Sequence, residues 1–415
     1  MRIVAHASDN RTLRARTSKL VSALPFHWKP AEISLAIMHP IYLDNNATTP
    51  VDPRVAEVAY RYSVDEYGNA GSRTHTWGLT AAKVAEEARR QIADPIGSQP
   101  DEVVFTSGAT ESDNLVVFGI AAHAEATGRM HLITTAVEHK AVLEPFEVLS
   151  KRGFEVTVLP VDKKGWPTAE DLAGALRDET VLVSTMHGNN ETGVELPLED
   201  YAAVLSDHDA WWHVDAAQTY GKRNEVLSDK RIDLISISGH KVFAPKGIGA
   251  LIVRRRGYER PPLTALMYGG GQERGLRPGT LPVALVASLG LAGQLAEQES
   301  VDRRVSCEAF RKQVIDALDS LGAEINGDPG RVLPHVVNAS IPGVDAEAAI
   351  VAIKDLVAIS NGSACTSASY EPSHVLTAMG LEEDRVAGAL RISWNHETPM
   401  PDWDAVTSRL SAITR

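Results

Sequence analysis

The hydrophobic positions between residues 51 and 281 fall into short apolar runs that are separated by amphipathic stretches. Most runs lack the alternation of a half-buried strand, as expected for strands covered on both faces of a mainly parallel sheet. The helical patterns between them predict an α/β domain. The predicted strands are 102–106, 130–135, 154–159, 180–184, 211–215, 234–238 and 249–253, and the first predicted helices are 55–62 and 80–93.

The pattern changes after Leu281. A long helical stretch is predicted over residues 283–321, and a further helix closes the chain. Strand-like runs between these helices, at 335–341, 357–360 and 389–394, predict a smaller α+β domain. We therefore expect two domains, the larger one built on a mainly parallel, seven-stranded sheet.

Residues 1–37 differ from the rest of the chain. They hold six basic and two acidic side chains, and they show neither strand alternation nor a capped helix. Because Met38 directly precedes the first ordered pattern, we expect a disordered leader or an over-long translation start, and an Arg-rich transit peptide is the alternative. The expected parts are a leader (1–37), a large domain (51–295) and a small domain (38–50 and 296–415).

The 415 residues are 44% hydrophobic and 23% charged, which is typical of a soluble globular protein with room for a large core. The formal net charge of -13 argues against direct binding of nucleic acid. No apolar run approaches the length that spans a membrane. The two cysteines, Cys307 and Cys365, do not form a disulfide framework and suit a reducing cytoplasm.

Polar residues follow the predicted strands, where ligands bind in open α/β sheets. Lys241 comes after the run 234–238 and a glycine, and a desolvated lysine there would form a Schiff base with an aldehyde cofactor. Taken alone, a solvated surface lysine is the more frequent outcome. Asp215 ends another apolar run and needs a cation such as a protonated pyridine nitrogen. A helix N-cap is an equally frequent role for such an aspartate.

Two further segments suggest an anion site and a thiol. Residues 106–111 pass from a strand through Gly108 into a helix, whose free N–H groups suit a phosphate, although capping boxes look similar. Cys365 lies among small and polar residues, which favours a reactive thiol over the buried, inert cysteine that is more common. Cys307 lies in a charged helical stretch, and we assign it no function.

Together these features are those of a fold-type I enzyme that uses pyridoxal 5′-phosphate (PLP) and has an added thiol. From about Ile41 onward the chain resembles the cysteine desulfurases of the class V aminotransferase family, in their long-loop, IscS/NifS-like group. Among its branches, that of DNA phosphorothioation is the most similar. The segments that carry the resemblance are 42–50, 106–114, 138–140, 186–193, 213–218, 236–241, 269–280 and the loop around Cys365.

The resemblance implies how PLP is held. Lys241 binds the aldehyde, Asp215 pairs with the pyridine nitrogen and Gln218 bonds the ring hydroxyl. His139 stacks on the ring and takes part in proton transfers. Thr280 reaches the phosphate of the other subunit, so that the enzyme is a homodimer. The phosphate of the same subunit is held by Ala109, Thr110, Ser238 and His240.

The resemblance also implies the reaction. Asn190, beside the cofactor, and Arg391 hold the carboxylate of L-cysteine, since a guanidinium binds a carboxylate bidentately. The Cys365 thiolate takes the sulfur as a persulfide, alanine leaves, and a protein acceptor receives the sulfur. No intrinsic metal is expected, although Cys365 is available to share a cluster with a partner.

The resemblance leaves the acceptor open between iron–sulfur cluster assembly, tRNA thiolation and DNA phosphorothioation. The chain stops soon after its terminal helix, whereas housekeeping members carry a further tail, and this difference favours a specialised acceptor. Residues 69–71, 334–335 and 395–396 depart from the family pattern, and the last two pairs are expected to reshape the substrate mouth.

Two other functions compete with this interpretation. One is another class V enzyme, such as a transaminase or a selenocysteine lyase, neither of which needs a thiol in this loop. The other is a sulfur carrier that has lost catalysis. The set of Lys241, Asp215, His139 and Arg391 argues against such a carrier.

Overall fold

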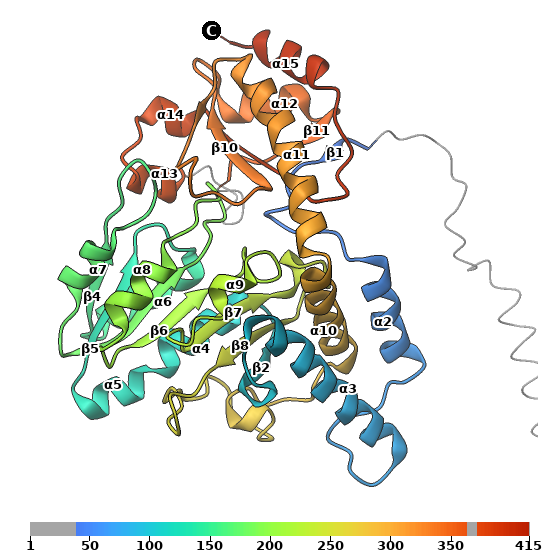
Figure 1. Ribbon diagram of the computed structural model, residues 1–415, viewed down its shortest axis with the longest axis vertical. Helices are drawn as coiled ribbons and strands as arrows, with labels where there is room; N and C mark the ends of the chain where they lie inside the picture. The colour runs from blue at the N-terminus through green and yellow to red at the C-terminus, as the bar shows by residue number, and fades with distance from the viewer. Residues whose placement is uncertain (1–38, 363–371, 415) are drawn as a thin grey trace, which may run out of the picture. The chain divides into compact units, whose positions relative to one another are not determined.

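The structure is a computed structural model that describes residues 39–362 and 372–414 (Figure 1). The predicted leader and Cys365 lie outside the described residues. Residues 40–415 form one compact unit, and the finer division predicted within it stays a prediction. In the part of the chain that is described, no helix has both the length and the apolar character needed to cross a membrane.

A seven-stranded sheet forms the centre of this unit, with the strand order β2-β8-β7-β6-β5-β3-β4. Neighbouring strands are parallel except at β8, which runs antiparallel to β2 and β7. The predicted mainly parallel sheet is confirmed. Its strands are β2 (Val103–Thr106), β3 (His131–Thr135), β4 (Glu155–Leu159), β5 (Thr180–Met186), β6 (Trp211–Asp215), β7 (Leu234–Ser238) and β8 (Gly249–Val253).

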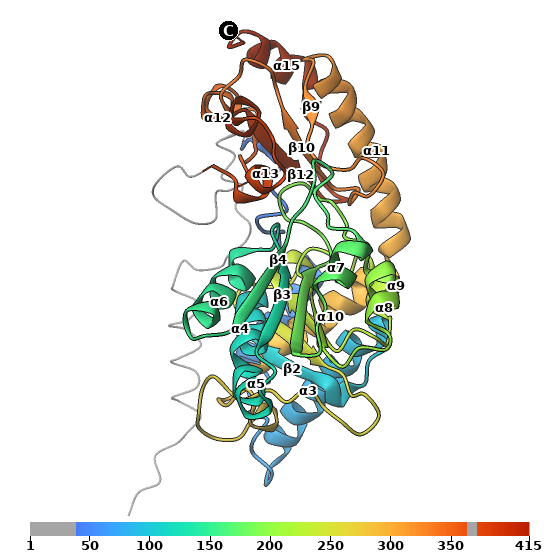
Figure 2. The same cartoon turned by 90° about the vertical axis from the view of Figure 1, so that its left-hand side faces the viewer.

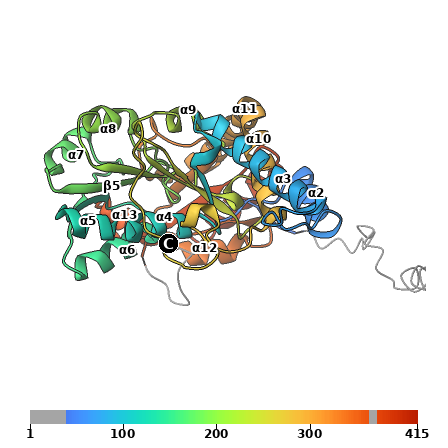
Figure 3. The same ribbon diagram turned by 90° about the horizontal axis from the view of Figure 1, so that it is seen from below.

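Successive side chains of these strands enter two cores on opposite faces of the sheet. On one face, Leu132 and Leu234 pack with side chains of α4 and α6. On the other face, Ile133 and Ile235 pack with side chains of α3, α8 and α10. Figures 2 and 3 show these helices on the two sides of the sheet. The helices of this lobe are α2 (Pro53–Val64), α3 (Thr76–Ala93), α4 (Ala109–Gly119), α5 (Ala121–Thr127), α6 (Lys140–Lys151), α7 (Ala169–Ala175), α8 (Leu198–Leu205), α9 (Asn224–Leu227) and α10 (Val283–Gln298).

A second lobe has its own core around two small sheets. One sheet pairs β1 with β11 in parallel, and the other is antiparallel in the order β12-β10-β9. Its elements are β1 (Ile41–Tyr42), α11 (Ser300–Asp319), β9 (Glu324–Ile325), β10 (Val336–Ser340), α12 (Ala346–Ile353), β11 (Val357–Ala358), α13 (His374–Ala378), α14 (Glu383–Ala387), β12 (Ala389–Ser393) and α15 (Trp403–Ser411).

The helical stretch predicted over 283–321 is confirmed, and it consists of two helices instead of one. The chain leaves the helical conformation at Glu299, where φ is -105° and ψ is 8°, so that α10 ends and α11 begins (Figure 1). The Glu299 carboxylate accepts hydrogen bonds from Arg54 of α2 and Arg303 of α11, each at 2.7 Å. These bonds hold the break in place, and α11 continues into the second lobe.

Candidate active site

A cavity of about 360 Å³ opens at the carboxyl ends of β5, β6 and β7, and it is closed on its other side by residues of the second lobe. This is the position where open α/β sheets bind ligands. All the predicted site residues except Thr280 and Cys365 line this one cavity. They are Ala109, Thr110, His139, Asn190, Asp215, Gln218, Ser238, His240, Lys241 and Arg391.

Asp215 ends β6 and is almost completely buried. The amide of Ala217 donates a hydrogen bond of 2.8 Å to its Oδ1. Burial raises the pKa of this carboxyl, while that bond and the neighbouring His139 and Lys241 oppose the rise. A carboxylate in such a place is stabilised by a cationic ligand, which is the requirement that a protonated pyridine nitrogen meets.

Lys241 ends the short 3-10 helix η3 (Gly239–Lys241), which directly follows β7. Its Nζ donates to the carbonyl of Ala47 at 2.8 Å and also to the carbonyl of Asn46. The same Asn46 carbonyl accepts a bond of 3.0 Å from Gln218 Nε2. The segment before α2 therefore positions both the Lys241 amine and the Gln218 side-chain amide.

His139 is the N-cap of α6, and its Nδ1 accepts a bond of 3.1 Å from the amide of Ala141. Burial lowers the pKa of this imidazole; Asp215 opposes the shift, whereas Lys241 and His374 add to it. The ring is therefore neutral near pH 7, with its second nitrogen left to exchange a proton.

The start of α4 forms an anion cradle. Gly108 precedes the helix at φ 153°, a conformation that favours glycine, and a Cβ added at the neighbouring Gly249 would meet Gly108 Cα at 2.6 Å. Both glycines thus allow the close approach of β8 to the helix start. His240 completes the cradle, and burial, with Lys241 and Lys246 nearby, lowers its pKa to about 4.

Arg391 reaches the cavity from β12 of the second lobe and is 1% exposed. Its Nη2 donates to Asp44 Oδ1 at 2.7 Å, and its Nη1 donates to the backbone carbonyl of Asn190 at 3.0 Å. Its Nε is buried and has no hydrogen-bond partner among the described residues. The guanidinium is thus held in place with donor capacity left for an anionic ligand.

Comparison with known proteins identifies the family. The class V aminotransferase model matches residues 41–406. Cysteine desulfurase IscS of Escherichia coli O139:H28 is 44% identical over 368 residues, which are 88% of this chain and 90% of that protein. The crystal structure of DndA from Streptomyces lividans matches with 48% identity and a TM-score of 0.76, and the match covers 85% of this chain and 99% of that chain.

A third relative is the structure of SspA in complex with cysteine. It has 36% identity and a TM-score of 0.75, and the match covers 85% of this chain and 98% of that chain. This chain belongs to the cysteine desulfurases of the class V aminotransferase family. The resemblance given by its motifs is thereby confirmed, and the desulfurase is PLP-dependent.

The residues of this desulfurase fit PLP. Gln218 Oε1 is buried and has no partner in the described part of the chain, so it has an acceptor to offer a ring hydroxyl. Asp215 is placed to pair with the pyridine nitrogen, Lys241 to attach the aldehyde, and the start of α4 to hold the phosphate. Bound there, PLP supplies an electron sink for bonds at the Cα of an amino acid.

Three residues in or beside the desulfurase site were not predicted from the sequence: Asn46, Asp113 and Glu138. Asn46 lies in a segment that the sequence singled out, but its backbone carbonyl carries no sequence signal. Asp113 of α4 lines the cavity with Oδ1 3.6 Å from His213 Nε2, and burial together with Asp215 raises its pKa. Glu138 is fully buried and accepts bonds of 2.7 Å from Thr135 Oγ1 and the Met186 amide.

The remaining predictions concern Thr280, Cys365 and two pairs of residues that depart from the family pattern. Thr280 lies on an exposed loop and does not line the cavity of its own chain. Cys365 lies outside the described residues. The pairs 334–335 and 395–396 line a second cavity and not that of the desulfurase site, and their effect on the substrate mouth stays a prediction.

Proposed function

We propose that this desulfurase converts L-cysteine to L-alanine and carries the sulfur as a persulfide on Cys365. The observation that supports the choice of thiol is the anchoring of residues 363–371 at both ends. Before them, the Gly362 carbonyl accepts a bond of 3.4 Å from Arg391 Nη1. After them, Ser373 Oγ donates to Glu191 Oε2 at 2.5 Å.

The two residues that hold these ends, Arg391 and Glu191, line the cavity or lie next to a residue that lines it. Arg391 lines the cavity, and Glu191 directly follows Asn190, which also lines it. His374 adds a bond of 2.9 Å from its Nε2 to the carbonyl of Glu138, next to His139. A nine-residue segment tied at these two places has the contour length to bring Cys365 over the cavity and to carry it outward.

The substrate carboxylate is bound by Arg391, with Asn190 beside it. The buried guanidinium is already oriented by Asp44, so little side-chain entropy is lost when a carboxylate binds. L-Cysteine is supported as substrate by the SspA structure, which contains cysteine. In the transfer, the substrate C–S bond breaks as the S–S bond to Cys365 forms, and the organic product leaves as alanine after gaining a proton.

Lys241 and His139 move the protons of this reaction. Lys241 would attach the aldehyde of PLP, and with substrate bound its free amine would act as a base in the cavity. His139, neutral because of burial, would exchange a proton through its Nε2, because its Nδ1 accepts the bond from Ala141. Asp215 would pair with the pyridine nitrogen.

The active enzyme is a homodimer in which Thr280 contacts the phosphate of the partner. Exposure of Thr280 away from its own cavity supports this assignment. A Thr280→Ala variant should lose PLP on dilution faster than the wild type, as followed by visible absorbance and by sedimentation. Equal retention would remove Thr280 from the phosphate site.

The sulfur acceptor is a protein, and we favour a specialised acceptor, with DNA phosphorothioation as the destination. The net charge of -13 supports transfer through a protein partner instead of direct binding to DNA. The 48% identity to DndA supports the specialised branch. Deleting the gene in its host should abolish phosphorothioate in genomic DNA, and a broad loss of iron–sulfur enzymes with normal phosphorothioate would favour the housekeeping role.

The reaction itself is tested by product analysis. With L-cysteine and a reducing agent, the PLP-loaded protein should form alanine and sulfide in equal amounts. A transaminase would instead form a 2-oxo acid without sulfide. Turnover of selenocysteine with no turnover of cysteine would identify a selenocysteine lyase.

A further inference from the structure

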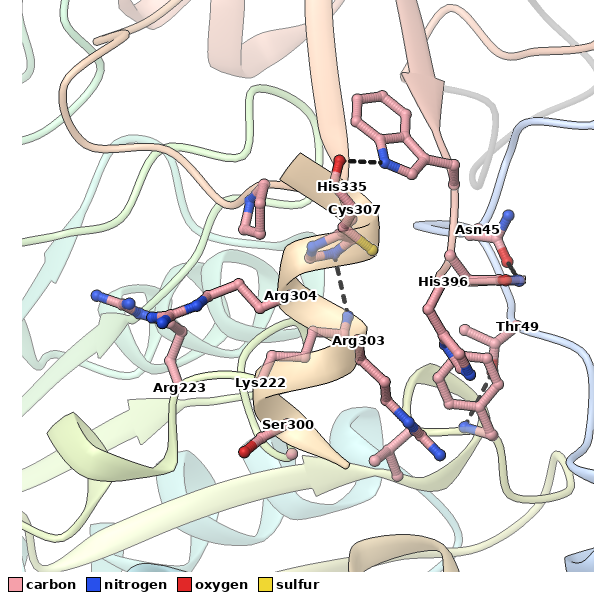
Figure 4. A pocket seen from close by; sticks show the side chains of 16 residues that line it. Asn45, Thr49, Lys222, Arg223, Ser300, Arg303, Arg304, Cys307, His335 and His396 are labelled. Carbon is pink, nitrogen blue, oxygen red and sulfur yellow. Dashed lines mark hydrogen bonds between the residues drawn. The ribbon is translucent and has the colours of Figure 1, made fainter. Parts of the chain in front are cut away.

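A second cavity, of about 60 Å³, lies between the two lobes and apart from the desulfurase site (Figure 4). The large lobe contributes the chain after Tyr220 and the chain after Lys241. The second lobe contributes the first turns of α11, the start of β10 and the residues that follow β12. No residue of this cavity lines the desulfurase site.

Lys222 and His335 meet across this cavity from opposite lobes, as Figure 4 shows. Lys222 Nζ lies 3.1 Å from His335 Nε2. His335 is buried, and so is Cys307, whose thiol is close enough to Lys222 for each to shift the pKa of the other. The lysine amine is thus enclosed by an imidazole, a thiol and apolar walls.

Lys222 differs from the other cations around the cavity because it has no carboxylate partner among the described residues. The three arginines of the lining are each paired with a glutamate. These pairs are Arg223–Glu195 at 2.7 Å, Arg303–Glu299 at 2.7 Å and Arg304–Glu308 at 3.7 Å. Lys222 is half-buried against an apolar cavity, where a cation without a counter-ion is costly, so the cavity lacks one negative charge when Lys222 is protonated.

The volume of the cavity limits the size of the ligand that can supply this negative charge. One water needs about 10–15 Å³ of such volume, so the cavity of about 60 Å³ holds about four to six water-sized groups. This excludes nucleotides, sugars and a second PLP. A chloride ion or a carboxylate of the size of formate fits, and α11 adds the positive end of a 20-residue helix at Ser300.

We propose that this cavity binds a small monovalent anion, such as chloride or formate, between Lys222 and His335. The protonated Lys222 amine donates to the anion, and the bond to His335 keeps the amine directed into the cavity. Because the anion completes an ion pair inside the protein, it binds together with one proton. Water alone cannot supply the missing charge.

Because the anion binds together with a proton, its affinity depends on pH. Burial lowers the pKa of Lys222 to about 7, and Lys241 adds to this shift. The anion therefore binds best below pH 7, and its apparent affinity falls about tenfold per pH unit above it. His335 stays neutral over this range because burial, Lys222 and Arg311 hold its pKa well below the usual value. The other ionisable groups that face the pair are Arg223, Arg303, Arg304, Cys307 and His396.

The cavity touches the segment that carries Lys241. Phe243, two residues after Lys241, has φ 67°, a left-handed conformation that is strained for a phenylalanine. Its ring lies 4.8 Å from the Arg303 guanidinium and 5.3 Å from the His396 ring. Second-lobe side chains thus hold this segment, and an anion here would bind where the two lobes meet behind the active site.

The test is thermal unfolding of the PLP-loaded protein at constant ionic strength. Sodium chloride and sodium formate are each compared with sodium gluconate, whose anion is too large for the cavity. At about pH 6 we expect at least one small anion to raise Tm by about 2 °C relative to gluconate, and at about pH 8.5 the rise should disappear. A rise with formate alone assigns a carboxylate, and a rise with chloride alone or with both assigns a simple anion.

Two variants test whether the rise in Tm comes from an anion bound at Lys222. Lys222→Met keeps the volume of the side chain without its charge and should lose the rise. Lys312→Met removes an exposed lysine of the same helix α11 that borders the cavity, and it should keep the rise. An equal rise in Lys222→Met would place the anion elsewhere, for example at Arg391. That result, a rise independent of pH, or no rise with either anion would overturn the proposal.

Discussion

At the scale of single residues, burial sets the charge of each group in the site. It keeps His139 neutral, and it makes Asp215 dependent on a cation. The sequence predicted Asp215 because it ends an apolar run, and it predicted His139 through the resemblance of its motif. It did not predict Asn46, because a backbone carbonyl contributes the bond and any residue type has one. A backbone contribution is visible in a sequence only where a pattern marks it, as the glycine before α4 does and the Asn46 carbonyl does not.

Replacing Lys241 should separate cofactor attachment from folding. Lys241→Ala should fold and lose both the visible absorbance of covalently bound PLP and all turnover, since no other lysine reaches the carbonyls of Asn46 and Ala47 in the described part of the chain. Absorbance after gel filtration and circular dichroism measure the two properties. A variant that keeps the spectrum of the wild type would contradict the assignment of Lys241.

Replacing Arg391 should affect cysteine and not PLP. Arg391→Ala should lower kcat/KM for L-cysteine by about ten- to a hundredfold, the equivalent of about 1.5–3 kcal/mol for a charge-assisted bond. Arg391→Lys should recover part of the loss, because it restores the charge without the planar fork. PLP content, measured after alkaline release, should be unchanged in both. An unaltered kcat/KM in Arg391→Ala would exclude this residue from the substrate site.

Glu138 should make stability depend on pH. Burial raises its pKa from 4.5 to about 8, so the folded state holds a proton that the unfolded state loses between these values. Stability should therefore fall as pH rises through this window, by up to about 1.4 kcal/mol per pH unit. Glu138→Gln has no such proton, and its stability relative to the wild type should increase with pH.

Urea unfolding between about pH 5 and pH 8 measures this difference. Glu144→Gln, at an exposed position of α6, is the matched control and should follow the wild type. Parallel pH profiles of Glu138→Gln and the wild type would show that Glu138 is ionised in the folded protein.

At the scale of elements, the strands of the large sheet were predicted within two residues at their ends, because most are short, mainly apolar segments between helical patterns. The helix break at Glu299 was not predicted, since no Gly or Pro marks it and one of the two arginines that bind Glu299, Arg54, is 245 positions away. The short helices α13 and α14 were missed for a similar reason: each is a five-residue helix with too little periodicity to detect.

The segment 269–280 depends on one buried ion pair. Glu273, at φ 48°, accepts bonds from Arg89 Nη1 at 2.9 Å and Nη2 at 2.5 Å, and from the amide of Phe105 at 2.8 Å. Removing one charge of a buried pair leaves the other uncompensated.

Glu273→Gln should therefore lower the free energy of unfolding by about 3–5 kcal/mol. The loop that carries Thr280 should also become more sensitive to proteolysis. Glu259→Gln, exposed in the chain before this segment, should leave both properties unchanged. A loss below about 1 kcal/mol would show that the pair does not hold the segment.

At the scale of the whole molecule, the catalytic cavity exists only because two lobes meet. Lys241, Asp215 and His139 come from the large lobe, whereas Arg391 comes from the second lobe. The sequence predicted this combination through the resemblance of its motifs. It did not predict the second cavity around Lys222 and His335, because these residues are 113 positions apart and nothing in the sequence links them, although 334–335 departs from the family pattern.

The step that defines this desulfurase is the storage of sulfur on Cys365. The most direct measurement is mass spectrometry of peptides after one exposure of the PLP-loaded protein to L-cysteine without reductant, followed by alkylation. We expect one added sulfur atom on the peptide with Cys365 and none on that with the buried Cys307. Cys365→Ser should bind PLP and carry no persulfide, whereas Cys307→Ser should behave as the wild type. Added sulfur on Cys307, or sustained sulfide release by Cys365→Ser, would contradict this expectation.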